Sequence, residues 1–296
     1  MWRLLVMMLL LLSLAAATMR PDDARAGISI ATWNMEWLVS PATAHAARLA
    51  CRAGRRSSLP CDVARRLSRD SADLSRLAWY ARRLDADIIA FQEVENAQAA
   101  ARIFSGYRIC IAGGHGLQHV GFAVRPGLAH RCGPSMEGVS LGGAQRLGMS
   151  MVLFPGSARA IELLTVHLKS GCADDPLESG SSACTLLARQ ARQLASWIDS
   201  RDGTRFVLLG DFNRGDADVA VDEFWAMLAG ADSADPPFVF AGAGVPFRNC
   251  HIGGGFTRGI DHILVSRALR HAVLPGGFRK PGYAETDVIR YRLPDH

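Results

Sequence analysis

Seven short apolar runs, spread along the 296-residue chain, limit its possible folds more than any other feature. Apolar runs of this length, bounded by polar and turn-forming residues, are typical of buried β-strands. We therefore expect strands at residues 28–32, 87–92, 120–124, 149–154, 161–168, 205–209 and 262–266.

Amphipathic helices are expected between these strands, because apolar residues recur there at helical spacing. One face of the first helix carries Leu74, Leu77, Ala78, Ala81 and Leu84, and one face of the second carries Leu187, Ala191, Leu194 and Ile198. A third, weaker pattern covers residues 219–228. Since strands and helices interleave without a strict βαβ alternation, we expect an α/β (α+β) fold in which mixed sheets pack together and helices lie outside.

The first 26 residues have the pattern of a signal peptide. Arg3 precedes an apolar run at residues 4–17, and a polar stretch ends in Ala24-Arg25-Ala26. The run is shorter than the roughly 20 apolar residues that span a bilayer, although an uncleaved membrane anchor is the alternative. We expect cleavage before Gly27 and a secreted or periplasmic monomer without stable membrane anchoring. Residues 27–296 are expected to form one domain, since no repeat or linker interrupts them.

Seven cysteines fit export to an oxidising compartment. Cys51 and Cys61 bracket a short Arg/Ser/Pro stretch, and Cys172 and Cys184 bracket an Asp/Gly/Ser-rich loop, so each pair is expected to close a loop. A third disulfide between Cys110 and Cys132 would join neighbouring strands and leave Cys250 unpaired. Free buried thiols are the alternative to this pairing.

The formal net charge of +5 and a pI near 9.0 suit a polyanionic substrate. Only Lys169 and Lys280 among the 33 basic residues are lysines, so we attribute part of this charge to a general arginine bias in composition. A basic surface that is only solvated is an equally good interpretation of net charge alone.

Polar residues recur where the expected strands begin or end. They are Asn34, Glu93, His167, Asp211, Asn213 and Asp261, with Asp295-His296 at the end of the chain. Each residue alone could be a cap or turn residue, but together they predict a site assembled along one edge of the sheets.

This inventory of carboxylates, amides and two histidines, without a serine or cysteine nucleophile motif, suits phosphodiester hydrolysis. The reaction needs a hard cation, for which carboxylate oxygens are natural ligands, and groups that position water and the leaving oxygen. A set without thiolates favours Mg²⁺, Mn²⁺ or Ca²⁺ over structural zinc.

The ordered set WN…QE…HLK…GDFN…IDH…DH, from Ile28 to the last residue, resembles the endonuclease/exonuclease/phosphatase superfamily, which includes pancreatic-type deoxyribonuclease. The resemblance implies a four-layer sandwich, with two mixed sheets face to face and helices outside.

The resemblance also implies a role for each matching residue. Glu93 would be the main metal ligand, with Asn34 and Asp295 near the metal. Asp211 would orient or activate water, Asn213 would hold the scissile phosphate, and His167 and His296 would face the phosphate, with His296 oriented by Asp261. Lys169, two residues after His167 in a strand, would point to the same face and bind phosphate, or else be a solvated edge lysine.

Two departures from the family pattern lead to further expectations. Gln118 stands where the deoxyribonuclease pattern has a glutamate that pairs with the first histidine, so His167 is expected to lack an ionised partner. The sequence stops at His296, where the family pattern continues for one more strand, so the final strand is expected to be missing.

A secreted nuclease acting on DNA or RNA is the function we expect from these features. The alternative is a sphingomyelinase-like lipid phosphodiesterase or an inositol-phosphate phosphatase of the same superfamily, which would use the same core. Phe238, Phe240 and Phe247 keep the lipid alternative open, because a lipid enzyme often carries an apolar protruding loop. A catalytically inactive binding module would have lost Glu93, Asp211 or His296, and all three are present.

Overall fold

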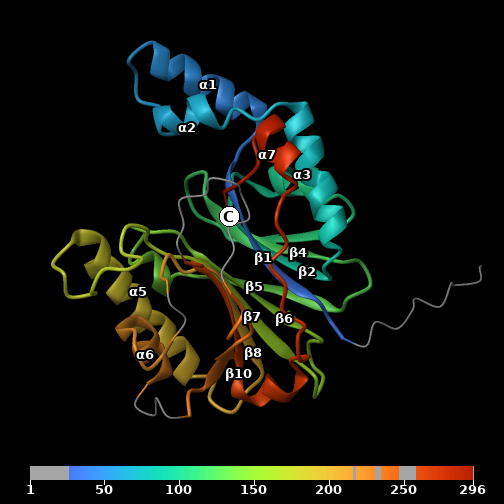
Figure 1. Cartoon of the computed structure of the whole chain (residues 1–296), viewed down its shortest axis with the longest axis vertical. Helices are drawn as coiled ribbons and strands as arrows, with labels where there is room; N and C mark the ends of the chain where they lie inside the picture. Colours follow the sequence, from blue (N-terminus) through green and yellow to red (C-terminus); the bar gives the residue numbers. More distant parts are fainter. Residues whose placement is uncertain (1–26, 216–217, 231–234, 247–257, 296) are drawn as a thin grey trace, which may run out of the picture.

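Two mixed β-sheets lie face to face in the computed structural model, which describes residues 27–215, 218–230, 235–246 and 258–295 (Figure 1). The first sheet has the order β1 (Ile30–Leu38), β2 (Ile88–Val94), β4 (His119–Val124), β3 (Arg108–Ile111). The second has the order β5 (His130–Met136), β6 (Gly148–Leu153), β7 (Ile161–His167), β8 (Phe206–Asp211), β10 (Asp261–Ser266), β9 (Phe238–Phe240).

All seven predicted strands are present, with ends shifted by a few residues. The prediction missed β3, β5 and β9. β3 and β9 are only four and three residues long, and β5 contains Gly133 and Pro134, which are unusual inside a strand. These short or interrupted segments lack a clear period-two pattern, so little in the sequence indicates them.

Helices cover the outer faces of both sheets. α3 (Ser71–Leu84) and α4 (Ala97–Ile103) pack on the first sheet, and α5 (Ser182–Asp199) and α6 (Glu223–Ala229) pack on the second. A separate apolar core fills the space between the sheets, with Phe122, Met151 and Leu209 among its fully buried side chains. The predicted four-layer sandwich is therefore confirmed, although α6 begins later than the pattern at residues 219–228 suggested.

Four α-helices were not predicted: α4, described above, and three others. α1 (Pro41–Arg52) and α2 (Cys61–Arg66) form a projecting pair at the top of Figure 1, and α7 (Glu285–Arg290) packs beside α3. Short 3₁₀ turns occupy Gly138–Ser140 and Arg267–Ala272. Among the described residues, no helix combines the length and the apolar character that a membrane crossing requires. The predicted signal peptide lies outside the described residues.

The three predicted disulfides are present, joining Cys51 to Cys61, Cys110 to Cys132 and Cys172 to Cys184. The second links β3 to β5 and therefore joins the two sheets, rather than neighbouring strands of one sheet. His130 lies close to it, but these sulfurs are committed to the disulfide and are not thiolate metal ligands. Cys250 lies outside the described residues.

The pairing of strands brings the predicted site residues to one end of the sandwich. β7 and β8 are parallel neighbours in which His167 pairs with Asp211, and antiparallel β10 places Asp261 opposite Asp211. Gly210 allows this close pairing, because a Cβ atom there would collide with the carbonyl oxygen of Val166, and its φ of 136° is one that L residues rarely adopt. The glycine of the GDFN motif is thus a packing requirement.

Candidate active site

β1 and β2 are irregular at the point where they carry the candidate metal ligands. Both strands extend past the predicted ends, and their pairing shifts register after Asn34 and around Glu93. Glu93 has a φ of 60°, and Glu36 and Trp37 have φ values of 42° and 55°. Positive φ in such residues costs free energy and is concentrated at functional sites, where the surrounding structure enforces it.

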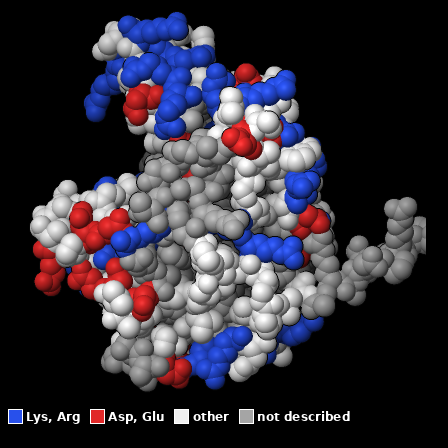
Figure 2. All heavy atoms as spheres, viewed as in Figure 1, with Lys and Arg blue, Asp and Glu red and all other residues white. Residues whose placement is uncertain are grey.

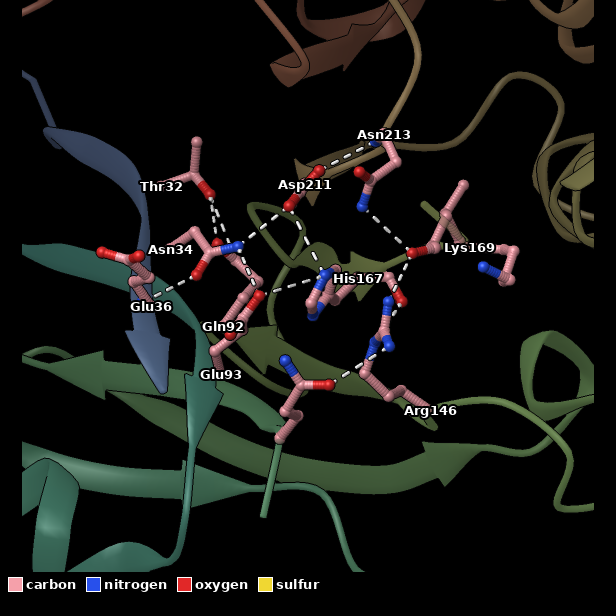
Figure 3. A network of polar contacts seen from close by, with 12 residues as sticks. Thr32, Asn34, Glu36, Gln92, Glu93, Arg146, His167, Lys169, Asp211 and Asn213 are labelled. Carbon is pink, nitrogen blue, oxygen red and sulfur yellow. Dashed lines mark hydrogen bonds and ion pairs between the residues drawn. The ribbon is translucent and has the colours of Figure 1, made fainter. Parts of the chain in front are cut away.

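The carboxylate of Glu93 is held by neutral donors and is only 9% exposed. Its Oε1 accepts a hydrogen bond from Asn34 Nδ2 at 3.3 Å (Figure 3), and its Oε2 accepts one from the Trp37 N–H at 3.0 Å. Asn34 is itself fixed, because its Oδ1 accepts a hydrogen bond from the Glu36 N–H at 2.9 Å. The strained turn after Asn34 therefore orients both side chains.

Asp211 lies on the other side of Asn34 and is 1% exposed. Asn34 Nδ2 donates to Asp211 Oδ2 at 2.9 Å, so one amide bridges two carboxylates from different sheets. The Asn213 N–H donates to Asp211 Oδ1 at 2.8 Å, and Asn213 Nδ2 donates to the Leu168 carbonyl at 3.1 Å. The amide of Asn213 retains a second N–H, which is available to an acceptor such as a phosphate oxygen.

His167 lies between the same two carboxylates. Its Nε2 is 3.6 Å from Glu93 Oε1 and 3.5 Å from Asp211 Oδ2. The expectation that His167 lacks an ionised partner is therefore wrong. It rested on position 118 alone, whereas the nearby carboxylates come from the facing sheet and from the neighbouring strand β8.

Gln118 instead belongs to the surroundings of Arg146, a site residue that the sequence analysis missed. Arg146 donates from Nη1 to Gln118 Oε1 at 3.3 Å, and from Nε and Nη2 to the carbonyl oxygens of His167 and Leu168 at 3.2 and 2.6 Å. Burial lowers the pKa of the Arg146 guanidinium, and the negative charges of Glu93 and Asp211 act in the opposite direction. Its position at the end of the glycine-containing stretch LGGAQR, just before β6, was the only available signal.

Lys169 lies outside β7, which ends at His167, so the expectation that Lys169 continues the strand is wrong. Its backbone N–H donates to Gln190 Oε1 at 2.8 Å, and its Nζ donates to the Ser170 carbonyl at 2.7 Å. The alternation of side chains in a strand therefore does not place Lys169 on the face of His167, and a phosphate contact by Lys169 stays a prediction without geometric support.

A second charged cluster, also missed, lies behind Asn34. Glu36 Oε1 and Arg66 Nη1 are 2.6 Å apart, and buried Arg69 donates from Nη1 to the carbonyls of Met35 and Glu36 at 2.9 and 2.8 Å. Burial, with the nearby charge of Asp295, raises the pKa of the Glu36 carboxyl, while Arg66 and Arg69 act to lower it. The structure thus places Asp295 near Glu36, and its role as a metal ligand stays a prediction.

Arg69 also ties β1 to the last described segment, since its Nε donates to the Arg292 carbonyl at 2.7 Å. We predict that Arg69→Met lowers the free energy of unfolding by about 3–5 kcal/mol, because it leaves the carbonyls of Met35, Glu36 and Arg292 without their donor and removes a buried positive charge beside Glu36. Arg66→Met is the matched control: Arg66 is 59% exposed, so its loss should cost about 1 kcal/mol or less. Urea denaturation measures both, and equal losses would contradict the role given to Arg69.

Two remaining candidates lie at the other strand ends. Asp261 begins β10 and pairs in register with Asp211, whereas His296, which Asp261 was predicted to orient, lies outside the described residues. The adjacent His262 is a core residue: its Nε2 contacts the Arg214 carbonyl at 2.9 Å, and its ring packs on Trp225. Burial lowers the pKa of His262, which keeps its imidazole neutral.

Comparison with known proteins identifies the family. The model of the Endonuclease/Exonuclease/phosphatase family matches residues 31–281, which include every candidate above except Asp295 and His296. The chain belongs to this family. Its members are metal-dependent phosphodiesterases and phosphatases, so the chain is a metal-dependent phosphoester hydrolase of this family. No curated protein sequence matches the chain.

Several solved structures share parts of this fold at low identity. D. rerio TDP2 complexed with single-strand DNA product is 17% identical, with 84% of this chain and 87% of that chain covered and a TM-score of 0.48. The Bacteroides thetaiotaomicron mannosyl-6-phosphatase is 13% identical (82% and 86% covered, TM-score 0.49). The human Nocturnin catalytic domain with bound sulfate is 14% identical (65% and 75% covered, TM-score 0.46). Similarity at this level carries no information about the substrate.

The donor set fits the divalent cation that this family uses. Glu93 offers a buried carboxylate whose hydrogen bonds come from an amide and a backbone N–H, and Asp211 adds a second carboxylate, linked to the first by the Asn34 amide N–H group. The amide oxygen of Asn34 accepts a hydrogen bond from the Glu36 N–H, so metal ligation by Asn34 stays a prediction. A buried carboxylate without a bound cation is costly, and oxygen donors of this kind suit a hard ion such as Mg²⁺. The residues present are therefore compatible with a cation held through Glu93.

Proposed function

We propose that this endonuclease/exonuclease/phosphatase-family chain is a secreted nuclease that hydrolyses the phosphodiester bonds of DNA, and of RNA as a second substrate, with Mg²⁺ as its cofactor. The cluster of Asn34, Glu93, His167 and Asp211 carries the proposal, since it gathers the groups for phosphodiester hydrolysis in one buried site (Figure 3).

Each residue has a distinct part in the proposed reaction. A hard divalent cation held by Glu93 would neutralise charge that develops on the phosphate. Asp211, fixed by Asn34 and by the Asn213 N–H, orients the attacking water and accepts its proton. His167 donates a hydrogen bond to a phosphate oxygen, and the remaining N–H of Asn213 binds a second one. Asp261 orients His296 toward the leaving oxygen, as the family resemblance implies.

The balance of charge favours a nucleic-acid substrate over a lipid. The chain has a formal net charge of +5, and positively charged side chains gather over α1 and α2 at the top of Figure 2. Phe238 and Phe240, which kept the lipid alternative open, belong to β9. Their side chains pack into the apolar core between the second sheet and helices α5 and α6. They therefore do not form a protruding apolar tip, while Phe247 lies outside the described residues.

Export is the second part of the proposal. Residues 1–26 have the composition of a signal peptide, and three disulfides suit an oxidising compartment. The mature protein would begin at Gly27 and would meet nucleic acid outside the cytoplasm.

Parallel assays on supercoiled DNA, RNA and sphingomyelin vesicles test the proposed substrate class. The protein without its first 26 residues should cleave DNA in the presence of Mg²⁺, and Asp211→Asn, prepared identically, should remove this cleavage and so exclude a contaminating nuclease. Turnover of vesicles that is lost in the Asp211→Asn variant, without cleavage of either nucleic acid, would favour the lipid alternative instead.

A further inference from the structure

The projecting pair of helices α1 and α2, with the loop between them, forms a rigid unit that we call the arginine hairpin (residues 41–66). The Cys51–Cys61 disulfide closes its loop, and a small apolar core with Ala47, Leu59 and Ala64 holds the two helices together. This core extends to Trp37 and Leu117 in the body of the protein. The hairpin therefore has a fixed direction relative to the sheets.

Positive charge is concentrated in this hairpin. It contains six arginines and one acidic residue, Asp62, an excess of five positive charges that equals the formal net charge of the whole chain. Figure 2 shows the resulting basic surface over α1 and α2. A general arginine bias in composition would spread such residues evenly, so it does not explain this concentration.

Four arginines of the hairpin are exposed and form no ion pair within the described part of the chain: Arg52, Arg55, Arg56 and Arg65. Elsewhere some arginines are paired, as Arg76 is with Asp287, and others, such as Arg189 and Arg192, are also exposed without an ion pair in the described part of the chain. The hairpin differs in gathering four of them on one short, projecting unit. Because like charges repel, four unpaired guanidinium groups on a short hairpin are more stable when an anion binds them.

Both ends of the hairpin are bound to the strands of the active site. At its start, Thr43 Oγ1 donates to Glu95 Oε1 at 2.6 Å, and Glu95 follows Glu93 by two residues. At its end, Arg66 pairs with Glu36, two residues after Asn34. The hairpin is thus fixed directly to the two segments that hold Asn34 and Glu93.

We propose that the arginine hairpin binds the phosphate backbone of a nucleic-acid substrate on the flank of the active site. This inference rests on the proposed nuclease function and names the part of the chain that selects long polyanions. The 12-residue α1 is about 18 Å long. Because duplex DNA carries one charge per roughly 1.7 Å of axis, α1 alone could lie along about ten phosphate charges.

The surface of the hairpin favours nucleic acid over an anionic membrane. A helix that lies in a membrane interface needs a wide apolar face. The apolar side chains Leu59 and Val63 are buried in the hairpin, and Leu49, 47% exposed, is its single large hydrophobic side chain on the surface. Backbone contacts by arginine require no such face and read no base sequence, so binding should be sequence-independent.

Direct binding tests the inference separately from catalysis. A fluorescently labelled DNA duplex is titrated in EDTA, so that no cleavage occurs, over a range of salt concentrations. The variant R52Q/R55Q/R56Q/R65Q should bind about 10-fold or more weakly than the parent, and the slope of log affinity against log salt should fall by about 3 to 4. The control R108Q/R131Q/R159Q/R205Q removes equal charge from exposed positions near the opposite end of the strands and should change both values little.

The outcomes separate the hairpin from the nuclease proposal. Unchanged binding in the hairpin variant, or equal losses in both variants, would overturn the inference. So would a parent that binds phosphatidylglycerol vesicles and no DNA. Hairpin-dependent DNA binding in a parent that never cleaves DNA would leave the inference standing and reject the nuclease function. In a cleaving parent, the hairpin variant should raise the KM for plasmid and leave hydrolysis of bis(p-nitrophenyl) phosphate unchanged.

Discussion

Replacing Asp211 by asparagine is expected to lower kcat on bis(p-nitrophenyl) phosphate by about 10²–10⁴-fold, the usual contribution of a positioned acid or base. The substitution keeps the size of the side chain and its bond to the Asn213 N–H, but removes the charge. In the parent, Asn34 Nδ2 donates to Asp211 Oδ2 at 2.9 Å; in the variant an amide N–H would replace this acceptor, so two donors would face each other. Asn34, which also donates a hydrogen bond to Glu93, would therefore shift.

Asp202→Asn is the matched control for this measurement. Asp202 is exposed and lies just before β8, at the opposite end of that strand from Asp211. Its variant should retain the kcat of the parent, and thermal denaturation should show that both variants are folded. An Asp211→Asn protein with nearly full kcat would remove Asp211 from the reaction.

Replacing Glu93 by glutamine is expected to raise the Mg²⁺ concentration for half-maximal activity by about 100-fold or more. Loss of an outer-shell partner already costs about 10–100-fold in metal affinity, and Glu93 is the candidate ligand itself. The substituted side chain would still accept the hydrogen bond from the Trp37 N–H through its amide oxygen, so the fold of the bulge should persist. The measurement is a Mg²⁺ titration of bis(p-nitrophenyl) phosphate hydrolysis.

Glu95→Gln provides the same chemical change two residues away. Glu95 binds Thr43 at the base of the arginine hairpin and has no place in the proposed reaction, so its variant should keep the parent's Mg²⁺ requirement on this small substrate. Identical titration curves for Glu93→Gln and the parent would show that the cation is held elsewhere.

Much of the site could be predicted from sequence, because its residues directly border buried strands. His167 and Asp211 end two parallel neighbours, so the strand pattern brings them together, and Asn34 and Glu93 lie where the regular pairing of β1 with β2 stops. Two of the disulfide pairs were predictable because each closes a short loop. The third was expected to join two strands, and it does, although the strands belong to different sheets.

Other parts depend on interactions that no local pattern records. Arg146 reaches the site from a loop, and Glu36 and Arg69 are buried together only because β1 bends at its bulge and the chain returns near Arg292. The buried face of α1 consists of small residues, Ala44 and Ala47, and α2 is only six residues long. Neither helix therefore shows the stripe of leucines that identified α3 and α5.

Cleavage of supercoiled plasmid tests the central claim most directly, because it requires the metal, the site and the substrate class together. The parent without residues 1–26 should nick the plasmid in Mg²⁺, lose this activity in excess EDTA and regain it when Mg²⁺ is restored. The Asp211→Asn and Glu93→Gln variants should stay inactive under the same conditions. Nicking that persists in EDTA, or that both variants retain in full, would contradict the account of a metal-dependent nuclease built around Glu93 and Asp211.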